Sequence, residues 1–346
     1  MTYPPDADKL LSTLRNGAWL DAQEFPPLSY AVPGLIPEGS VLLVGAPKIG
    51  KSWLVLAVGL AASEGGKALG LDIPKRPVLY LALEDGDRRL QDRCRRLLGT
   101  DPIPPEFQYL NRIEPGRAGD IIAAWLYWHH EPPPLIILDT LGKVLPPTQL
   151  GEDRYQRDYR VGSALKRIVD EHPGTTLLVN HHDRKAIAED FVDSVSGTHG
   201  LAGAADTIIV LARDRNEAAG LIKVTGRDVA EGEYAVTFKD GAVWELDGHD
   251  LEVARQKAQQ VKATTRATAA AAGDRMVDVV LYAYRHPQGV RRGDVAKALN
   301  LEPSVAGAGC TWPGPPTPAG CSGPSVASTP LLRVLRRYVR GPRPTT

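Results

Sequence analysis

One octapeptide limits the folds open to this chain more than any other feature. Residues 45–52 read GAPKIGKS, which fits the pattern G-x-x-x-x-G-K-S. In this pattern the glycines let backbone N–H groups turn inward around an anion. The lysine reaches the β- and γ-phosphates of a nucleotide, and the serine hydroxyl binds Mg²⁺.

The sequence on either side of the octapeptide supports this interpretation. Residues 40–44 form a short apolar, β-branched run, and residues 53–62 are apolar and contain no proline. A strand, a loop and a helix in this order direct a helix N-terminus at phosphate. The alternative is an ordinary glycine-rich turn before a helix. We predict that the following residues bind the nucleotide: Gly45, Ala46, Pro47, Lys48, Ile49, Gly50, Lys51, Ser52 and Trp53.

Composition excludes several classes of protein. The chain has 346 residues, with 41 basic and 41 acidic side chains, so its overall charge does not indicate nucleic-acid binding. Cys94, Cys310 and Cys321 lack C-x-x-C spacing, which favours neither a disulfide framework nor a zinc ribbon. The N-terminus does not resemble a signal peptide, and no apolar run is as long as a membrane span. We therefore expect a cytoplasmic protein that has no membrane partner.

Residues 38–248 alternate between strand-like and helix-like segments. This alternation predicts an α/β fold with a mostly parallel sheet, helices on both faces and antiparallel strands at one edge. We expect helices at 52–63, 87–98, 118–130 and 154–171. The expected strands are Val41–Val44, Val78–Leu83, Phe107–Leu110, Leu135–Leu138, Thr176–Asn180, Thr207–Leu211, Leu221–Val224 and Ala235–Phe238.

The regions outside this domain differ from it in composition. Residues 1–37 are rich in proline and form a lead-in, and the polar, alanine-rich residues 249–273 form a linker. We expect two short helices in residues 274–302, an arrangement that resembles the start of a winged-helix or helix-turn-helix module. Residues 303–330 contain seven prolines and five glycines and no charged residue, so we expect disorder through the basic end at 346.

Two carboxylates are predicted at the carboxyl ends of strands. Asp139 directly follows the apolar run 135–138. A Walker B aspartate, which holds Mg²⁺, has this position, although an aspartate after a strand can also cap a helix. Residue 140 is threonine, so the base that orients the attacking water must lie elsewhere. Glu84 follows the strand at 78–83 and is the best candidate. Asp85 and Asp87 are competitors, for which capping of the next helix is the simpler interpretation.

Histidines and an arginine follow two further strands. His181 and His182 end the strand that begins at Thr176, and one of them could sense the γ-phosphate. Neighbouring strand residues face opposite sides, so a metal site shared by both is disfavoured. Arg227 follows the strand at 221–225, where it could serve a neighbouring subunit as an arginine finger. The alternative for Arg227 is a surface ion pair with Asp228.

In combination, these motifs resemble those of a known family. The octapeptide at 45–52 has the pattern of a phosphate-binding P-loop. Besides this P-loop and Glu84, the chain carries Leu138-Asp139-Thr140, the string from His181 to Lys185, the segment 196–206 and Val224-Thr225-Gly226-Arg227-Asp228. Together they resemble the RecA-like ATPases of the plasmid RepA type, which are relatives of the DnaB replicative helicases and occur on phages and mobile elements. The resemblance covers about residues 30–248.

The resemblance implies roles for these residues. Lys51 and Ser52 would bind the phosphates of ATP and Mg²⁺, Asp139 would be the Walker B acid, and Glu84 would be the catalytic base. His181 or His182 would couple the nucleotide state to DNA. Arg227 would act in trans, so a ring, usually a hexamer, would be the active form.

The same resemblance implies that single-stranded DNA passes through the centre of the ring. Two loops at the carboxyl edge could contact it: residues 142–156, with Lys143 and Arg154, and residues 183–200, with Arg184 and Lys185. Solvated surface is the alternative, because acidic residues in both loops offset the positive charge.

Three functions remain open from the sequence. The first is a DNA-dependent ATPase motor of helicase type, which acts in the replication of a phage, plasmid or integrated element. The second is an ATP-switched DNA-binding regulator that does not unwind DNA, and the third is a RecA-like recombination or repair mediator. Glu84 and Arg227 favour nucleotide turnover, although the fold alone does not distinguish the three.

Overall fold

The computed structural model describes residues 9, 11–182, 199–214, 217–264, 295 and 297–298, without the side chains of 182 and 199. The chain divides into two units, Met1–Ala263 and Thr264–Thr346. The helices and strands discussed below belong to the first unit. The predicted helix-turn-helix fragment at 274–302 and the tail at 303–346 lie almost wholly outside the described residues, so both stay predictions.

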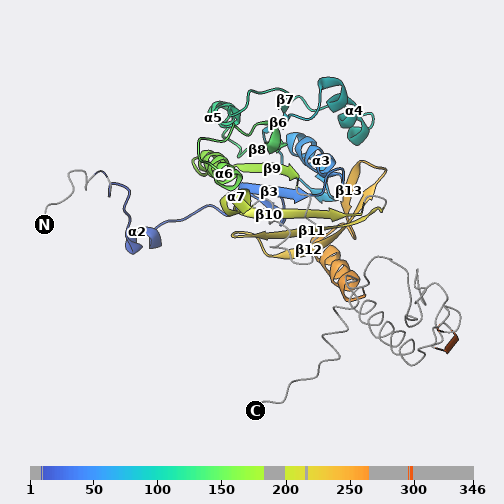
Figure 1. Cartoon of the computed structure of the whole chain (residues 1–346). Coiled ribbons are helices and arrows are strands. Elements are labelled where there is room, and N and C mark those ends of the chain that lie inside the picture. The colour runs from blue at the N-terminus through green and yellow to red at the C-terminus, as the bar shows by residue number, and fades with distance from the viewer. Residues whose placement is uncertain are drawn as a thin grey trace, which may run out of the picture. The chain divides into compact units, whose positions relative to one another are not determined.

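A nine-stranded sheet forms the centre of the first unit (Figure 1). Its strand order is β13-β12-β11-β10-β3-β9-β8-β6-β7, in which β3, β6, β7, β8, β9 and β10 run parallel. Strands β11, β12 and β13 continue one edge by antiparallel pairing. The bounds are β3 Gly39–Gly45, β6 Val78–Ala82, β7 Phe107–Leu110, β8 Leu135–Asp139, β9 Thr176–His182, β10 Thr207–Arg213, β11 Ala219–Gly226, β12 Gly232–Lys239 and β13 Val243–Leu246.

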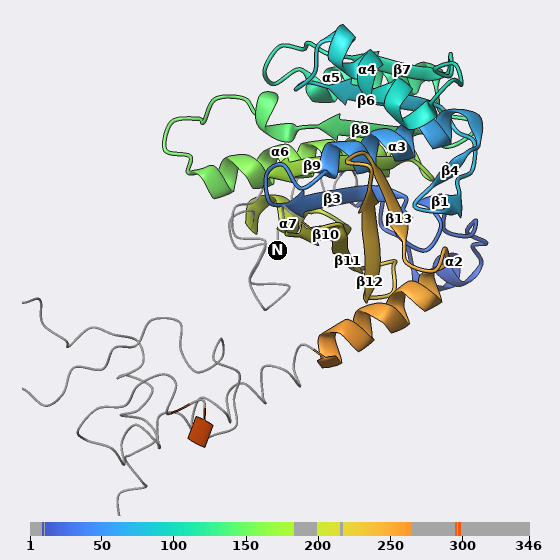
Figure 2. The ribbon, with the colours of Figure 1, turned by 90° about the vertical axis from the view of Figure 1, so that its right-hand side faces the viewer.

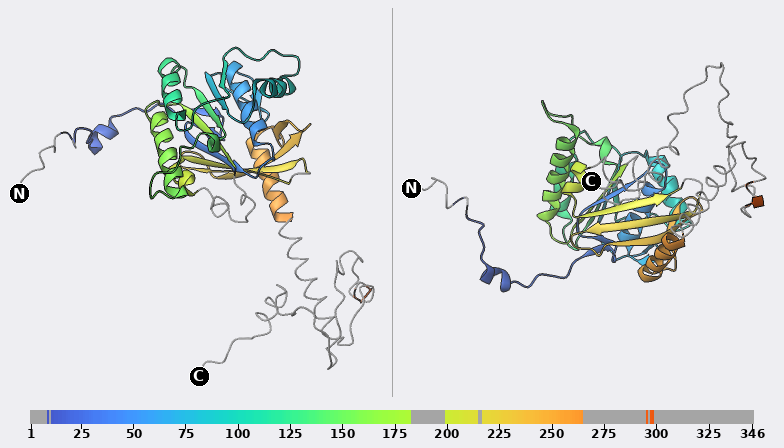
Figure 3. Two further views of the ribbon diagram at one scale, coloured as in Figure 1. Left: turned by 45° about the horizontal axis from the view of Figure 1, so that its top comes forward. Right: turned by 60° about the horizontal axis from the view of Figure 1, so that its bottom comes forward.

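Helices cover both faces of this sheet because its central strands are apolar on both sides. In β3, Val41 and Leu43 pack on one face, whereas Leu42 and Val44 pack on the other. Helices α3 Lys51–Glu64 and α4 Asp87–Leu98 cover the first face. The second face is covered by α5 Ala118–Trp128, α6 Arg154–Asp170 and α7 His199–Ala204 (Figures 2 and 3).

These elements confirm the predicted fold class. Each of the four predicted helices is present, and each of the eight predicted strands overlaps an observed one. Strand β13 was not predicted, although Asp240-Gly241 before it is a strong hairpin signal and both residues have positive φ. Within the described ranges, no helix has the length and apolar character needed to cross a bilayer.

Smaller elements lie outside the main sheet. Strands β1 Tyr30–Val32 and β2 Ile36–Pro37 form a hairpin whose residues Ala31, Val32 and Ile36 are buried in the core. The packed core therefore begins before residue 38, where the sequence suggested a boundary. Strands β4 Lys67–Ala68 and β5 Leu71–Asp72 form a second hairpin, and α2 Gly17–Asp21 has no buried residue. Residues 251–264, in the predicted linker, are helical.

Candidate nucleotide site

The P-loop connects the end of β3 to the start of α3, as the sequence predicted. Gly50 has φ 108° and Lys48 has φ 67°, and this backbone shape turns the loop back toward the helix. A Cβ atom at Gly45 would lie 2.5 Å from the carbonyl oxygen of Leu211, so only glycine fits there. Glycines at these two positions allow the close backbone turn that a phosphate nest requires.

Lys51 lies inside the loop. Only 3% of this residue is exposed, and its Nζ donates hydrogen bonds to the carbonyl oxygens of Gly45 (2.8 Å) and Ala46 (3.0 Å). A buried ammonium group surrounded by loop backbone is a strong point charge for an anion. The position of Lys51 therefore suits a lysine that binds phosphate.

Asp139 is the centre of a buried cluster beside the P-loop. Its Oδ2 accepts a hydrogen bond from the Tyr80 hydroxyl at 2.7 Å. Its Oδ1 accepts from Ser52 Oγ at 3.2 Å and from Asn180 Nδ2 at 2.6 Å. Burial raises the pKa of the Asp139 carboxyl, while these three hydrogen bonds act in the opposite direction. The structure thus brings Ser52 and Asp139 together, as expected for a Walker pair.

Asn180 and Tyr80 are site residues that the sequence did not identify. Asn180 ends the apolar part of β9 and is fully buried. Its Oδ1 has no hydrogen-bond partner among the described residues, although its amide nitrogen bonds to Asp139. The position of Asn180 at a strand terminus was a signal that could have been used. Tyr80 offered no such signal, because it lies in the middle of the apolar strand β6.

The donor set suits a magnesium ion. Mg²⁺ prefers oxygen ligands and usually keeps several waters. Ser52 Oγ, the Asp139 carboxylate and the Asn180 Oδ1 supply oxygen atoms within one cluster. The residues present therefore fit a metal bound together with phosphate.

Glu84 lies at the same edge of the sheet. Its exposed carboxylate accepts a hydrogen bond from Thr140 Oγ1 at 3.1 Å, and Thr140 directly follows Asp139. Strands β6 and β8 are neighbours, with Ala82 paired to Asp139. Glu84 is thus brought beside the Asp139 cluster while remaining accessible to water.

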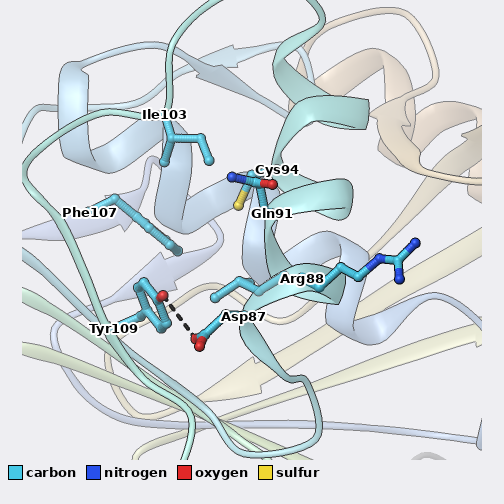
Figure 4. Close-up of a pocket in the computed structure, with 8 residues that line it drawn as sticks. Asp87, Arg88, Gln91, Cys94, Ile103, Phe107 and Tyr109 are labelled. Atoms are coloured by element: carbon cyan, nitrogen blue, oxygen red, sulfur yellow. Dashed lines mark hydrogen bonds between the residues drawn. The ribbon is translucent and has the colours of Figure 1, made fainter.

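The capping interpretation of Asp85 and Asp87 is wrong. The N-cap of α4 is Gly86, and no side chain bonds to the cap. Asp85 is buried in ion pairs with Arg93 and with Arg89, the latter at 3.0 Å. Asp87 instead accepts hydrogen bonds from Tyr109 at 3.0 Å (Figure 4) and from Asn111.

Asp87 also lines a pocket between α4 and β7. The other lining residues are Arg88, Leu90, Gln91, Cys94, Ile103, Phe107 and Tyr109 (Figure 4). None of them is a predicted site residue, and β7 is at the edge of the sheet remote from β13. The pocket therefore shares no lining residue with the P-loop cluster.

The histidines end β9, next to the P-loop strand. In register, His181 pairs with Val44 and His182 pairs with Gly45. His181 is half-buried, and the His182 side chain lies outside the described part of the structure. No group of three histidine, cysteine, aspartate or glutamate side chains that could hold a metal occurs within the residues that the structure describes. A role in sensing phosphate stays a prediction.

Arg227 and the P-loop of the same chain lie at opposite ends of the parallel strands: Arg227 is near their amino ends, and the P-loop is at their carboxyl ends. Gly226 is level with Thr207, which pairs with Val41 near the start of β3, whereas the P-loop follows the end of β3. The Arg227 side chain is 68% exposed and lies 3.4 Å from Asp206 Oδ1. Asp206, not the Asp228 considered from the sequence, is its partner.

The predicted DNA loops are described only in part. Lys143 ends the short 3₁₀ helix Leu141–Lys143 and is exposed, and Arg154 begins α6. Arg184 and Lys185 lie outside the described residues. No observation tests DNA contact by either loop.

The sheet topology and the cluster of Lys51, Ser52 and Asp139 define a P-loop nucleotide-binding domain with a RecA-like fold. A family model described as an AAA domain matches residues 5–187, more than half of the chain. The chain therefore belongs to the AAA domain family.

A solved structure shares its fold. A DnaB-like replicative helicase, whose structure was described with its interactions with primase, is 13% identical with a TM-score of 0.51. That match covers 69% of this chain and 70% of the helicase chain. Another solved structure, of an ATPase domain, is 13% identical over 60% of this chain and 84% of its own length, but its TM-score of 0.48 is too low to add support. No curated protein matches the sequence.

Proposed function

We propose that this chain is an ATP-hydrolysing motor of replicative-helicase type, which acts on single-stranded DNA as a hexameric ring. Its place would be the replication of a phage, plasmid or integrated element. The observation that carries the proposal is the convergence of Lys51, Ser52, Asp139 and Glu84 at one edge of the sheet.

Each residue of this cluster has a chemical role in the proposal. Lys51 would neutralise the β- and γ-phosphates, and Ser52 and Asp139 would hold Mg²⁺. When bound, Mg²⁺ supplies positive charge that stabilises the negative charge developing on the phosphate oxygens. Glu84 would accept a proton from the attacking water, since its carboxylate is exposed and oriented by Thr140.

The position of Arg227 supports assembly of several chains. Because Arg227 and the P-loop lie at opposite edges of one sheet, an arginine that completes the ATP site would come from a neighbouring copy. A head-to-tail contact of this kind closes into a ring when the rotation between copies permits. An arginine supplied in trans stabilises charge on the transferred phosphoryl group.

The loop 142–156 supports a link between the ATP site and DNA. It begins two residues after Thr140, within the 3₁₀ helix Leu141–Lys143, so movement at the phosphate would need to pass through only this short segment. Lys143 and Arg154 would then contact the DNA backbone in a salt-dependent way. Arg184 and Lys185 would do the same from the loop after His181 and His182.

The test combines three measurements on the full chain. These are ATP hydrolysis with and without single-stranded DNA, strand displacement on a forked duplex, and particle size by light scattering. We expect DNA-stimulated hydrolysis, displacement and a ring-sized particle. Hydrolysis without displacement would favour the ATP-switched regulator or the recombination mediator, and absence of hydrolysis would contradict the motor.

A matched pair of variants tests the proposed base. Glu84→Gln should retain nucleotide binding and lose hydrolysis by about a hundredfold or more, as expected for a general base. Asp87→Asn is the control, because it changes an exposed carboxylate three residues away. Among the described residues, Asp87 accepts side-chain hydrogen bonds only from Tyr109 and Asn111, so this variant should hydrolyse ATP normally. Equal rates in the two variants would contradict the role of Glu84.

A further inference from the structure

Two backbone carbonyls of the P-loop are held by side chains from β10 and β13. Arg213, at the end of β10, donates from Nε to the carbonyl oxygen of Ile49 at 3.1 Å. Trp244, on β13, donates from Nε1 to the carbonyl oxygen of Gly50 at 3.0 Å. The P-loop motif does not include either residue.

Tight packing keeps these two donors in place. Trp244 is 2% exposed, and its ring centroid lies 4.7 Å from that of Phe238 on β12. The Arg213 guanidinium lies over the Phe238 ring, 4.6 Å from its centroid. A Cβ atom at Gly50 would lie 3.0 Å from Trp244 Nε1, so the indole is in direct contact with the loop. These side chains have little freedom to move away from the P-loop.

The geometry of the peptide bond connects these contacts to phosphate binding. In a planar trans peptide, the carbonyl oxygen and the next N–H point in opposite directions. Holding the Ile49 carbonyl therefore orients the Gly50 N–H, and holding the Gly50 carbonyl orients the Lys51 N–H. Backbone N–H groups of the P-loop are the groups that surround phosphate.

The two contacts differ in what they add. The Gly50 carbonyl also accepts hydrogen bonds from the N–H groups of Trp53 and Leu54 at the start of α3. Trp244 therefore reinforces a carbonyl that the helix already orients. Arg213 acts one residue earlier, before the helix begins, and brings a positive charge to the anion-binding loop.

We propose that Trp244 and Arg213 are positioning residues, which hold the backbone of Ile49, Gly50 and Lys51 in the shape that binds phosphate. This inference rests on the proposed function of the P-loop as a nucleotide site. A loop that already has its bound shape loses less conformational entropy when the nucleotide binds, so these contacts favour binding. Their loss should weaken nucleotide binding and leave the chemical step nearly unchanged.

The test begins with Trp244→Phe, which keeps an aromatic ring and removes the N–H donor. We expect the Kd for ADP and the KM for ATP to rise by about three- to tenfold, the range for one hydrogen bond, with kcat within about twofold. In the absence of nucleotide, backbone hydrogen exchange in the segment 45–54 should be faster in Trp244→Phe than in wild type. Phe107→Leu is the control, because it also removes aromatic volume from the core but lies on β7, at the other edge of the sheet.

Arg213→Gln provides a second test if Trp244→Phe does not fold. The half-buried Arg213 side chain is at a strand end, so its loss should not prevent folding. This variant should show the same faster exchange in 45–54. Wild-type exchange and ADP affinity in the folded variants would overturn the inference, as would a fall in kcat with unchanged KM. If the wild-type chain binds ADP but does not hydrolyse ATP, the proposed motor function is refuted. The positioning role of Trp244 and Arg213 would then still be tested by hydrogen exchange and by the affinity of the variants for ADP.

Discussion

Asp139 shows how one residue can depend on several distant parts of the chain. It is 2% exposed and accepts hydrogen bonds from Tyr80, Ser52 and Asn180, which lie on β6, α3 and β9. A buried carboxylate without such partners would be costly. The position of the Asp139 carboxylate therefore depends on the packing of all three elements.

Tyr80→Phe tests the contribution of one of these partners. It removes only the hydroxyl that donates to Asp139, so the free energy of unfolding should fall by about 1–3 kcal/mol. Urea unfolding without nucleotide measures this change. Tyr109→Phe is the control, because the Tyr109 hydroxyl donates to Asp87 in an exposed position and its loss should cost less than about 0.5 kcal/mol. Equal effects of the two variants would contradict the account.

Cys94 offers a probe of local opening. Burial on the core side of α4 raises the pKa of its thiol to about 11, so little thiolate forms near pH 8. Iodoacetamide at pH 8 should leave Cys94 unmodified in the native protein and alkylate it in urea, as read by peptide mass spectrometry. Rapid alkylation of the native protein would show that α4 is not packed as described.

At the scale of elements, apolar patterns predicted most of the sheet. Parallel strands covered on both faces carry continuous apolar runs, and β3, β6, β8 and β9 each contain such a run. The P-loop, Asp139 and Glu84 were predictable because each lies at or just beyond the end of such an apolar run. Their shared position at the carboxyl edge then follows from the parallel arrangement.

The remaining site residues could not be predicted for a physical reason. Tyr80, Arg213 and Trp244 act through contacts with residues far away in the chain, and those contacts depend on the order of strands in the sheet. A single sequence does not reveal that order. Trp244 also has the pattern of an ordinary core aromatic, which gives no sign of a hydrogen bond to the P-loop.

The start of α6 gives a prediction about pH. Hydrogen bonds from Arg160 are the main cause that lowers the pKa of Glu152 to about 2. The ordinary value is about 4.3, so Glu152 contributes stability above that pH and loses it as the pH falls toward about 2. The difference in unfolding free energy between wild type and Glu152→Gln should therefore shrink over this range. A constant difference from pH 7 to pH 2 would contradict the ion pair.

At the scale of the whole molecule, the two edges of the sheet carry different parts of the proposed ATP site. The P-loop, Asp139 and Glu84 lie at the carboxyl edge, whereas Arg227 lies at the amino edge near Asp206. A second copy could supply the missing arginine. The proposed activity is therefore a property of the assembly.

Mixing two inactive variants tests this division. Lys51→Ala retains Arg227, and Arg227→Ala retains the P-loop, so each alone should be inactive. In randomly mixed rings about a quarter of the sites would combine an intact P-loop with a neighbour's arginine, and hydrolysis should return to about that level. Full hydrolysis by Arg227→Ala alone, or no recovery in mixed rings, would refute the finger in trans.

The most direct test of the central claim is calorimetry of nucleotide binding. Wild type should bind one Mg²⁺–ADP per chain, and Lys51→Ala should bind it about a hundredfold more weakly, because charge-assisted hydrogen bonds to phosphate are lost. If wild type takes up no nucleotide at millimolar concentration, or if Lys51→Ala binds as tightly as wild type, the carboxyl edge of this sheet is not a triphosphate site.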